Sequence, residues 1–161
     1  MSKITLDNAT ITESTIGDHI NYTKREIVGY DPTYCNAWDE RGNCIGTGGG
    51  DPIYGNVPYK TSAKINGTIT ATVTNVKING KSPIVVGDKT NESDSYTIPT
   101  GGTYTSGSHT GVTTGSVTVG NAKNVYVNGK SVAIGGSTVT THAGTSATIR
   151  DGLSSSVNIG G

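Results

Sequence analysis

The stretch NVKINGKS at residues 75–82 returns as NVYVNGKS at residues 124–131. In both copies an Asn-Gly pair stands between alternating apolar and polar residues, which is the strongest short-range signal for a β-hairpin. A segment of this length is too short to fold by itself. We therefore expect each copy to belong to a unit that packs against other units of the same kind.

Three similar units follow one another along the chain. They span residues 64–88, 111–136 and 146–161, and within the third, shorter unit Ser156–Gly160 follows the pattern of Asn124–Asn128. Because units of this size cannot bury a face singly, we expect them to pack around a common axis. The sequence therefore predicts an all-β fold, a short three-sided β cone or prism with pseudo-threefold repeats.

The composition agrees with a thin β structure. The chain has 24 Gly, one Trp and no Phe, and hydrophobic residues make up 32% of it. Val, Ile, Thr and Tyr favour strands, whereas Gly and Asn supply turns with positive φ. Disorder is the alternative for a chain rich in Ser, Thr and Gly. The alternation of apolar and polar residues and the charged fraction of 15% favour a folded chain.

The first 59 residues differ from the rest. We interpret residues 1–59 as a loop-rich extension with short strands, and residues 60–161 as the β-repeat domain. Large rings gather in the extension, and they either cover the wide end of the β body or form a docking surface. They are Tyr22, Tyr30, Tyr34, Trp38, Tyr54 and Tyr59.

Charge and motifs disfavour several classes of function. The net charge is zero and no basic run is present, which argues against nucleic-acid binding. The sequence shows no stretch long enough to span a bilayer and no secretory signal, so we expect synthesis in the cytoplasm. We expect no enzyme, because H-E-x-x-H, G-x-S-x-G and phosphate-loop motifs are missing. In a reducing cytoplasm, Cys35 and Cys44 are expected to be free thiols or a metal ligand.

Three stretches resemble the PAAR and PAAR-like spike-tip proteins, namely residues 75–88, 124–136 and 139–161. The shared pattern is a strand, V-x-V-N-G-K, a small-residue stretch, and a segment with a His before a small residue and Gly. The resemblance covers residues 60–161. Ser82–Val85 and Ser131–Ile134 stand where the family has its Pro-Ala-Ala-Arg tetrapeptide. This difference, with no C-terminal toxin extension, favours a phage or phage-like tail over a type VI secretion system.

The resemblance implies a structural function. A spike-tip protein caps and sharpens the trimeric central spike of a contractile tail or injection machine, and it contacts the target envelope during piercing. The partner would be the trimeric tail-hub spike at the baseplate of a virion or injection machine, and the tip itself would be monomeric. The alternative is a phage tail adhesin or carbohydrate-binding module that uses the aromatic rings of residues 1–59.

The resemblance also implies one metal ion near the apex, held by His and Cys ligands. His109 and His142 precede the second and third units at equivalent positions, so both are ligand candidates. The third ligand would be His19, Cys35 or Cys44. The residues alone, without the resemblance, favour ordinary loop histidines. The implied ion is a structural zinc, with iron as the alternative.

Overall fold

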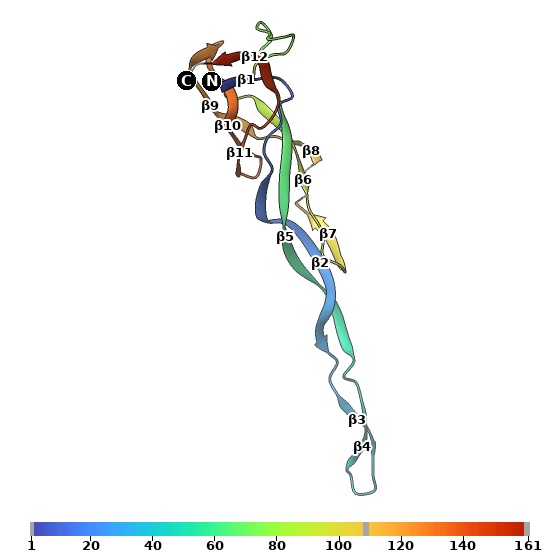
Figure 1. Cartoon of the computed structure of the whole chain (residues 1–161). Coiled ribbons are helices and arrows are strands. Elements are labelled where there is room, and N and C mark those ends of the chain that lie inside the picture. The colour runs from blue at the N-terminus through green and yellow to red at the C-terminus, as the bar shows by residue number, and fades with distance from the viewer. Residues whose placement is uncertain (1, 108–109, 160–161) are drawn as a thin grey trace.

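The computed structural model describes residues 2–107 and 110–159, and these residues form an all-β protein (Figure 1). They contain no helix that could cross a membrane. The strands are β1 (Ser2–Thr5), β2 (Ser14–Tyr30), β3 (Tyr34–Trp38), β4 (Cys44–Gly48), β5 (Pro52–Thr70), β6 (Lys89–Ser95), β7 (Gly102–Ser106), β8 (Thr110–Thr113), β9 (Ser116–Val127), β10 (Lys130–Thr140), β11 (Ser146–Thr148) and β12 (Leu153–Ile159).

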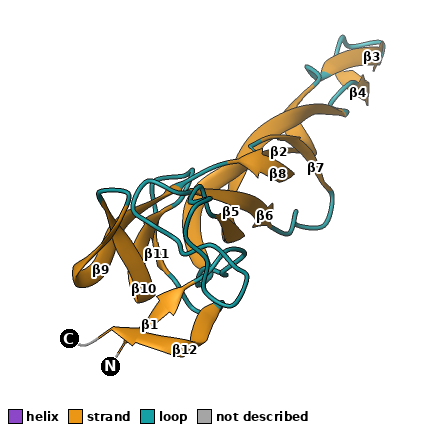
Figure 2. Ribbon diagram, turned by 90° about the horizontal axis from the view of Figure 1, so that it is seen from above, coloured by secondary structure: helices purple, strands orange, loops and turns teal. Residues whose placement is uncertain are grey.

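Most strands belong to one antiparallel sheet with the order β12-β1-β10-β9-β6-β5-β2-β7. In addition, β11 pairs with β10 and β8 pairs with β6, whereas β3 and β4 form a separate two-stranded sheet. The molecule is long and tapered (Figure 1). Its broad end, here called the head, holds the strands β1 and β9–β12, and Figure 2 shows these strands together from above, with β2, β7 and β8 away from them.

A long hairpin of β2 and β5 extends from the head. The two strands pair from Ser14 opposite Ile65 to Tyr30 opposite Pro52. β7 adds a third strand only beside residues 21–24 of β2. Beyond that point the hairpin is two-stranded, and it ends in the distal hairpin, residues 31–51, which contains β3 and β4 (Figure 1).

The prediction that residues 1–59 are a loop-rich extension is wrong, because most of this segment is β-strand. The predicted boundary at residue 59 falls inside β5, and β1 lies between β10 and β12. Alternating Ile, Tyr, Thr and Val residues account for the strands. Two Asp-Pro pairs, Asp31-Pro32 and Asp51-Pro52, mark only the junction with the distal hairpin, where the Asp31 N–H donates to the Asp51 carbonyl at 2.8 Å.

Both Asn-Gly pairs form the predicted hairpin turns. Asn79 and Gly80 have φ of 50° and 80°, and Asn128 and Gly129 have φ of 52° and 77°. Two successive residues with positive φ define a type I′ turn, whose twist matches that of paired strands. The second turn joins β9 to β10. The first turn closes only an isolated bridge between Ile78 and Lys81. It lies beyond the end of β5 at Thr70, and within the described residues no strand flanks it.

Two small hydrophobic clusters fill the head. One lies nearer the long hairpin and is built from Ala9, Ile11, Ile69, Ile84, Val117, Ala133, Val139, Ala147 and Ile149. The other combines Ile4, Leu6, Val73, Val85, Ala122, Val132, Ile134 and Ile159 with the partly buried Val76, Ile78, Val125, Val127 and Val157. The second cluster thus receives apolar side chains from all three similar stretches of the sequence.

Side-chain amides also join these stretches. Asn75 and Asn128 exchange two hydrogen bonds, at 3.1 Å and 3.0 Å between amide nitrogen and oxygen. The Asn79 amide donates to the Ser156 hydroxyl at 2.7 Å. The polar residues of the repeated segments therefore connect hairpins that lie far apart in the sequence.

Candidate metal centre

Two carboxylates are buried on one face of β6. The strand alternates strictly, so Thr90, Glu92 and Asp94 turn toward the interior while their neighbours face out. The side chains of Glu92 and Asp94 have no exposed surface. Because an ionised carboxylate is expensive to bury alone, this pair requires positive charge or several hydrogen-bond donors close by.

His142 lies between the two carboxylates. It comes from the tight turn after β10, which closes with a hydrogen bond from the Gly144 N–H to the Thr141 carbonyl at 2.9 Å. Its ring Nδ1 lies 2.6 Å from Glu92 Oε2, and its backbone N–H donates to the same oxygen at 2.8 Å. Its Nε2 lies 3.3 Å from Asp94 Oδ1, and the side chain is 3% exposed.

His19 approaches Asp94 from β2. Its Nε2 lies 2.8 Å from Asp94 Oδ2, and its side chain is 15% exposed. The β2–β5 register shifts between Ile16 and Ile20, and Asp18 takes a φ of 53°, so the strand is locally irregular where His19 turns inward. The rings of His19 and His142 are 5.5 Å apart between centroids.

The donor set suits a transition-metal ion. One ligand atom each from His19, Asp94 and His142 lies within 4.8 Å of the others. Two imidazoles and a carboxylate are ligands that zinc accepts, and the same set is known for iron(II). In the tautomer of His142 whose Nδ1 donates a hydrogen bond to Glu92, the lone pair of Nε2 is directed toward Asp94 and His19. Glu92 is therefore placed as an outer-shell residue.

Hydrogen bonds and two nearby glycines hold the Glu92 side chain in one orientation. The Thr90 hydroxyl donates to Glu92 Oε1 at 2.6 Å, and the Gly115 N–H donates to the Thr90 hydroxyl at 2.6 Å. A Cβ at Gly115 would lie 2.6 Å from Glu92 Oε1, and one at Gly67 would lie 2.9 Å from Glu92 Cγ. Glycine is thus needed at both positions for the carboxylate to keep this orientation.

The structure brings together two of the five ligand candidates and places two others in the distal hairpin, away from the site. His19 and His142 meet at the site, and His109 lies outside the described residues. Cys35 and Cys44 form a disulfide in the distal hairpin, so the expectation of free thiols or a metal ligand is wrong. They lie on the paired strands β3 and β4, with 5.9 Å between their Cα atoms, a spacing that permits the bond.

Sequence reasoning missed both carboxylates. β6 reads KTNESDS and contains no apolar residue, so neither hydrophobic periodicity nor turn signals indicated a strand there. The available signal was the spacing of Glu92 and Asp94, since acids two apart on a strand share one face.

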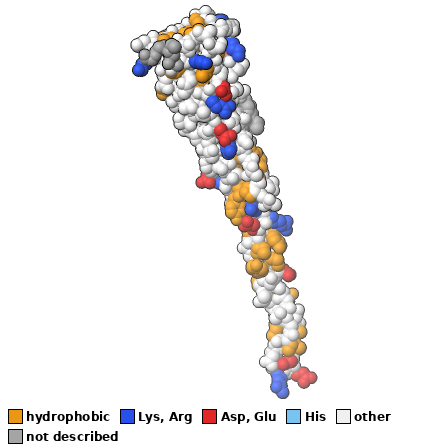
Figure 3. Space-filling view, viewed as in Figure 1, with side chains coloured by type: hydrophobic (Ala, Val, Ile, Leu, Met, Phe, Trp, Pro, Cys, Tyr) orange, Lys and Arg blue, Asp and Glu red, His pale blue; other side chains and the backbone are white. Residues whose placement is uncertain are grey.

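The rings of residues 1–59 do not cover the broad end. They lie along the long hairpin and the distal hairpin, where apolar side chains are visible in Figure 3. Tyr22 is buried and stacks on Tyr59 at 5.6 Å between centroids. More than half of the surface of four rings is exposed, namely Tyr30, Tyr34, Trp38 and Tyr54.

Comparison with known proteins adds no relative. Neither a family model, nor a curated protein, nor a solved structure matches this chain.

Proposed function

We propose that this protein is a PAAR-like structural tip, which caps and sharpens the trimeric central spike of a phage tail or a related injection machine. The observation that carries the proposal is the partly buried His19–Asp94–His142 cluster. It joins β2, β6 and the turn between β10 and β11, three segments that lie far apart in the sequence, near the place where the long hairpin leaves the head.

The packing of the head supports the same proposal. The three similar stretches contribute valines and isoleucines to one cluster. Hydrogen bonds from side-chain amides also link these stretches. We interpret this arrangement as a pseudo-threefold β cone, a form that would match the end of a trimeric spike. The taper from the head to the distal hairpin gives a narrow leading end (Figure 1).

A bound ion would act as a structural staple. Among the described residues, the two clusters of the head contain aliphatic but no aromatic side chains, so hydrophobic burial alone gives a modest core. Metal binding by residues from three segments adds directly to the free energy of folding. We propose zinc, with iron as the alternative for a ligand set of nitrogen and oxygen. In this function the protein transmits force and catalyses no reaction.

Metal analysis of the purified protein, combined with native mass spectrometry, tests the proposal. We expect one zinc or iron ion per monomeric chain. The double variant H19A/H142A should lose the ion and melt at a lower temperature, whereas E13Q, which removes an exposed carboxylate, should keep both properties. A metal-free protein that forms a stable homotrimer would contradict the spike-tip function.

The exposed rings favour one second candidate, a tail adhesin or carbohydrate-binding module. Arg25 lies over the Tyr54 ring, 5.2 Å from its centroid, and the Tyr34 ring lies against Gly48, so both rings are held in place. Amphipathic rings presented in this way suit sugar and protein contacts. Glycan binding that is lost in Y34A/W38A and kept in Y126A, which removes an exposed ring on the head, would favour the adhesin.

A further inference from the structure

The net charge of zero conceals a separation of charge along the molecule. The second hydrophobic cluster is surrounded by residues 2–7, 73–88, 120–135 and 153–159, here called the broad face. These segments carry five lysines and two aspartates, a formal charge of +3. The distal hairpin, residues 31–51, carries three aspartates, one glutamate and one arginine, a formal charge of −3.

The lysines of the broad face are available to a partner. All five are exposed, namely Lys3, Lys77, Lys81, Lys123 and Lys130. Basic side chains are visible at this end of the molecule in Figure 3. The hydrogen bonds of Asn75 with Asn128, and of Asn79 with Ser156, hold the hairpins that carry four of them together. Lysines that form no basic run in the sequence thus gather at the broad end of the fold.

The two aspartates of this end do not neutralise that surface. Asp88 is fully buried, where it accepts hydrogen bonds from the Thr72 hydroxyl and from the Val85 N–H at 2.9 Å. Asp7 is half-buried and accepts from the Ala71 N–H at 2.8 Å. Both carboxylates therefore serve the backbone of the head, and the exposed charge of the broad face is positive.

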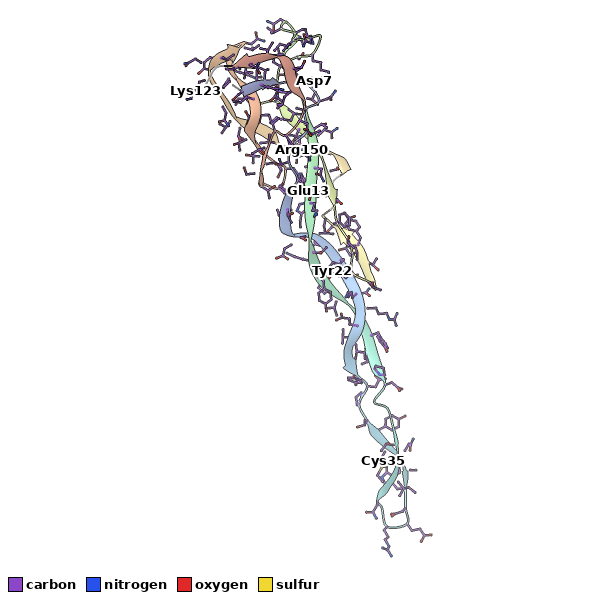
Figure 4. The ribbon with its side chains drawn as sticks, in the orientation of Figure 1. Asp7, Glu13, Tyr22, Cys35, Lys123 and Arg150 are labelled. Atoms are coloured by element: carbon purple, nitrogen blue, oxygen red, sulfur yellow. A yellow bond between two sulfur atoms is a disulfide. The ribbon has the colours of Figure 1, made fainter. Side chains whose placement is uncertain are left out.

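We propose that the broad face docks onto an acidic protein surface, an inference that rests on the proposed function and adds the chemistry of the partner. Complementary charge steers association and rejects partners of the wrong sign. Tyr126 is 63% exposed on the same hairpin as Lys123 and Lys130, and it supplies the aromatic anchor that protein interfaces favour. Lys123 and the distal Cys35 mark opposite ends in Figure 4.

The charge at the other end makes this docking directional. An acidic partner attracts the broad face and repels the distal hairpin, so the molecule associates with its narrow end pointing away. A protein fits better than a nucleic acid or a lipid surface. Those polyanions are bound by dense basic clusters, whereas here five lysines surround hydroxyl, amide and aromatic side chains.

Binding to immobilised poly-L-glutamate at low ionic strength tests the proposal with the full-length protein. The test variant is K3Q/K81Q/K123Q/K130Q, which leaves Lys77 because its Nζ donates to the Ser82 hydroxyl. The control is K24Q/K60Q/K64Q/K89Q, which removes the same charge from the long hairpin and β6. We expect the association rate to fall at least about tenfold in the test variant and to change much less in the control.

Carbodiimide coupling of the glutamate carboxylates to lysine, followed by peptide mapping, locates the contact independently. We expect cross-links at Lys3, Lys81, Lys123 and Lys130. Equal losses in both variants, or cross-links spread over the whole molecule, would overturn the proposal. Binding to phosphatidylglycerol vesicles with the same lysine dependence would overturn it in favour of a lipid surface. Concentration-dependent polymers by light scattering would overturn it in favour of head-to-tail association of copies.

The metal content of the same samples separates this inference from the proposed function. A metal-free protein that forms a stable homotrimer contradicts the spike tip whatever its charge dependence. A metal-loaded protein whose two lysine variants bind alike contradicts only the docking surface.

Discussion

At the scale of single residues, two buried carboxylates on β6 define the chemistry of the site. Asp94 lies within contact distance of both imidazoles, whereas Glu92 orients His142 through two contacts to one oxygen. A carboxylate behind a ligating histidine fixes the ring and raises its basicity. The two acids on one strand therefore have separate functions at the proposed metal centre.

We expect E92Q to weaken metal binding without abolishing it. The amide oxygen can still accept from the His142 backbone, but the negative charge that supports the imidazole is lost. Outer-shell substitutions of this kind lower metal affinity by about 10–100-fold. Competition with a chromogenic chelator measures the change, and E13Q serves as the control because Glu13 is an exposed acid that pairs with Lys64. Unchanged affinity in E92Q would contradict the outer-shell assignment.

Asp39 orders the outermost turn, and its titration gives a second expectation. Its carboxylate accepts from the Asn43 side chain at 3.0 Å and from the backbone N–H groups of Asn43 and Arg41 at 2.9 Å and 2.8 Å. The Asn43 side-chain bond, followed by these backbone bonds, lowers the pKa of Asp39 below its ordinary value of 3.8. The ordering is thus fully present above pH 3.8 and is lost as the pH falls through the lower, folded value.

NMR titration of the amide signals of Arg41 and Asn43 measures this transition. We expect a midpoint below 3.8 in the parent protein and no transition of these signals in D39N. A midpoint at or above the ordinary value would show that the turn does not depend on the Asp39 hydrogen bonds.

At the scale of elements, the Asn-Gly hairpins could be predicted because their signal is local. Two residues with positive φ need Asn and Gly, and both turns have the expected geometry. β6 could not be predicted from its apolar pattern, because its inward residues are Thr90, Glu92 and Asp94. The long hairpin was missed because its exposed apolar residues and Gly-rich end resemble a loop in composition.

The turn at Gly129 allows a clean test of the backbone requirement. A Cβ at this residue meets nothing within 4 Å, so G129A introduces only the cost of a left-handed conformation. We expect a loss of about 1 kcal/mol in the free energy of unfolding, measured by denaturant titration. G29A is the matched control, because Gly29 is equally unobstructed but has no positive φ. Equal stability of both variants would contradict the turn assignment.

At the scale of the whole molecule, the N-terminal segment and the repeat region share one core. Ile4 and Leu6 lie in one hydrophobic cluster of the head, Ala9 and Ile11 lie in the other, and His19 lies at the candidate metal centre. Sequence similarity between units indicated the repeat region but gave no information on these contacts, which join residues more than a hundred positions apart. The distal hairpin, by contrast, contributes no residue to either cluster.

Because of this difference, we expect opposite results from deleting the whole N-terminal segment and from deleting the distal hairpin alone. Removing residues 1–59 deletes β1 and β2 and exposes the edges of β5 and β10, so we expect loss of cooperative folding and of metal binding. Replacing residues 32–50 by Asn-Gly joins Asp31 to Asp51, whose backbones are already linked by the hydrogen bond from the Asp31 N–H to the Asp51 carbonyl, through a type I′ turn. We expect that shortened protein to keep its metal and nearly the melting temperature of the parent. Calorimetry with metal analysis measures both, and a cooperatively folded, metal-binding 60–161 fragment would show that the head is independent of β1 and β2.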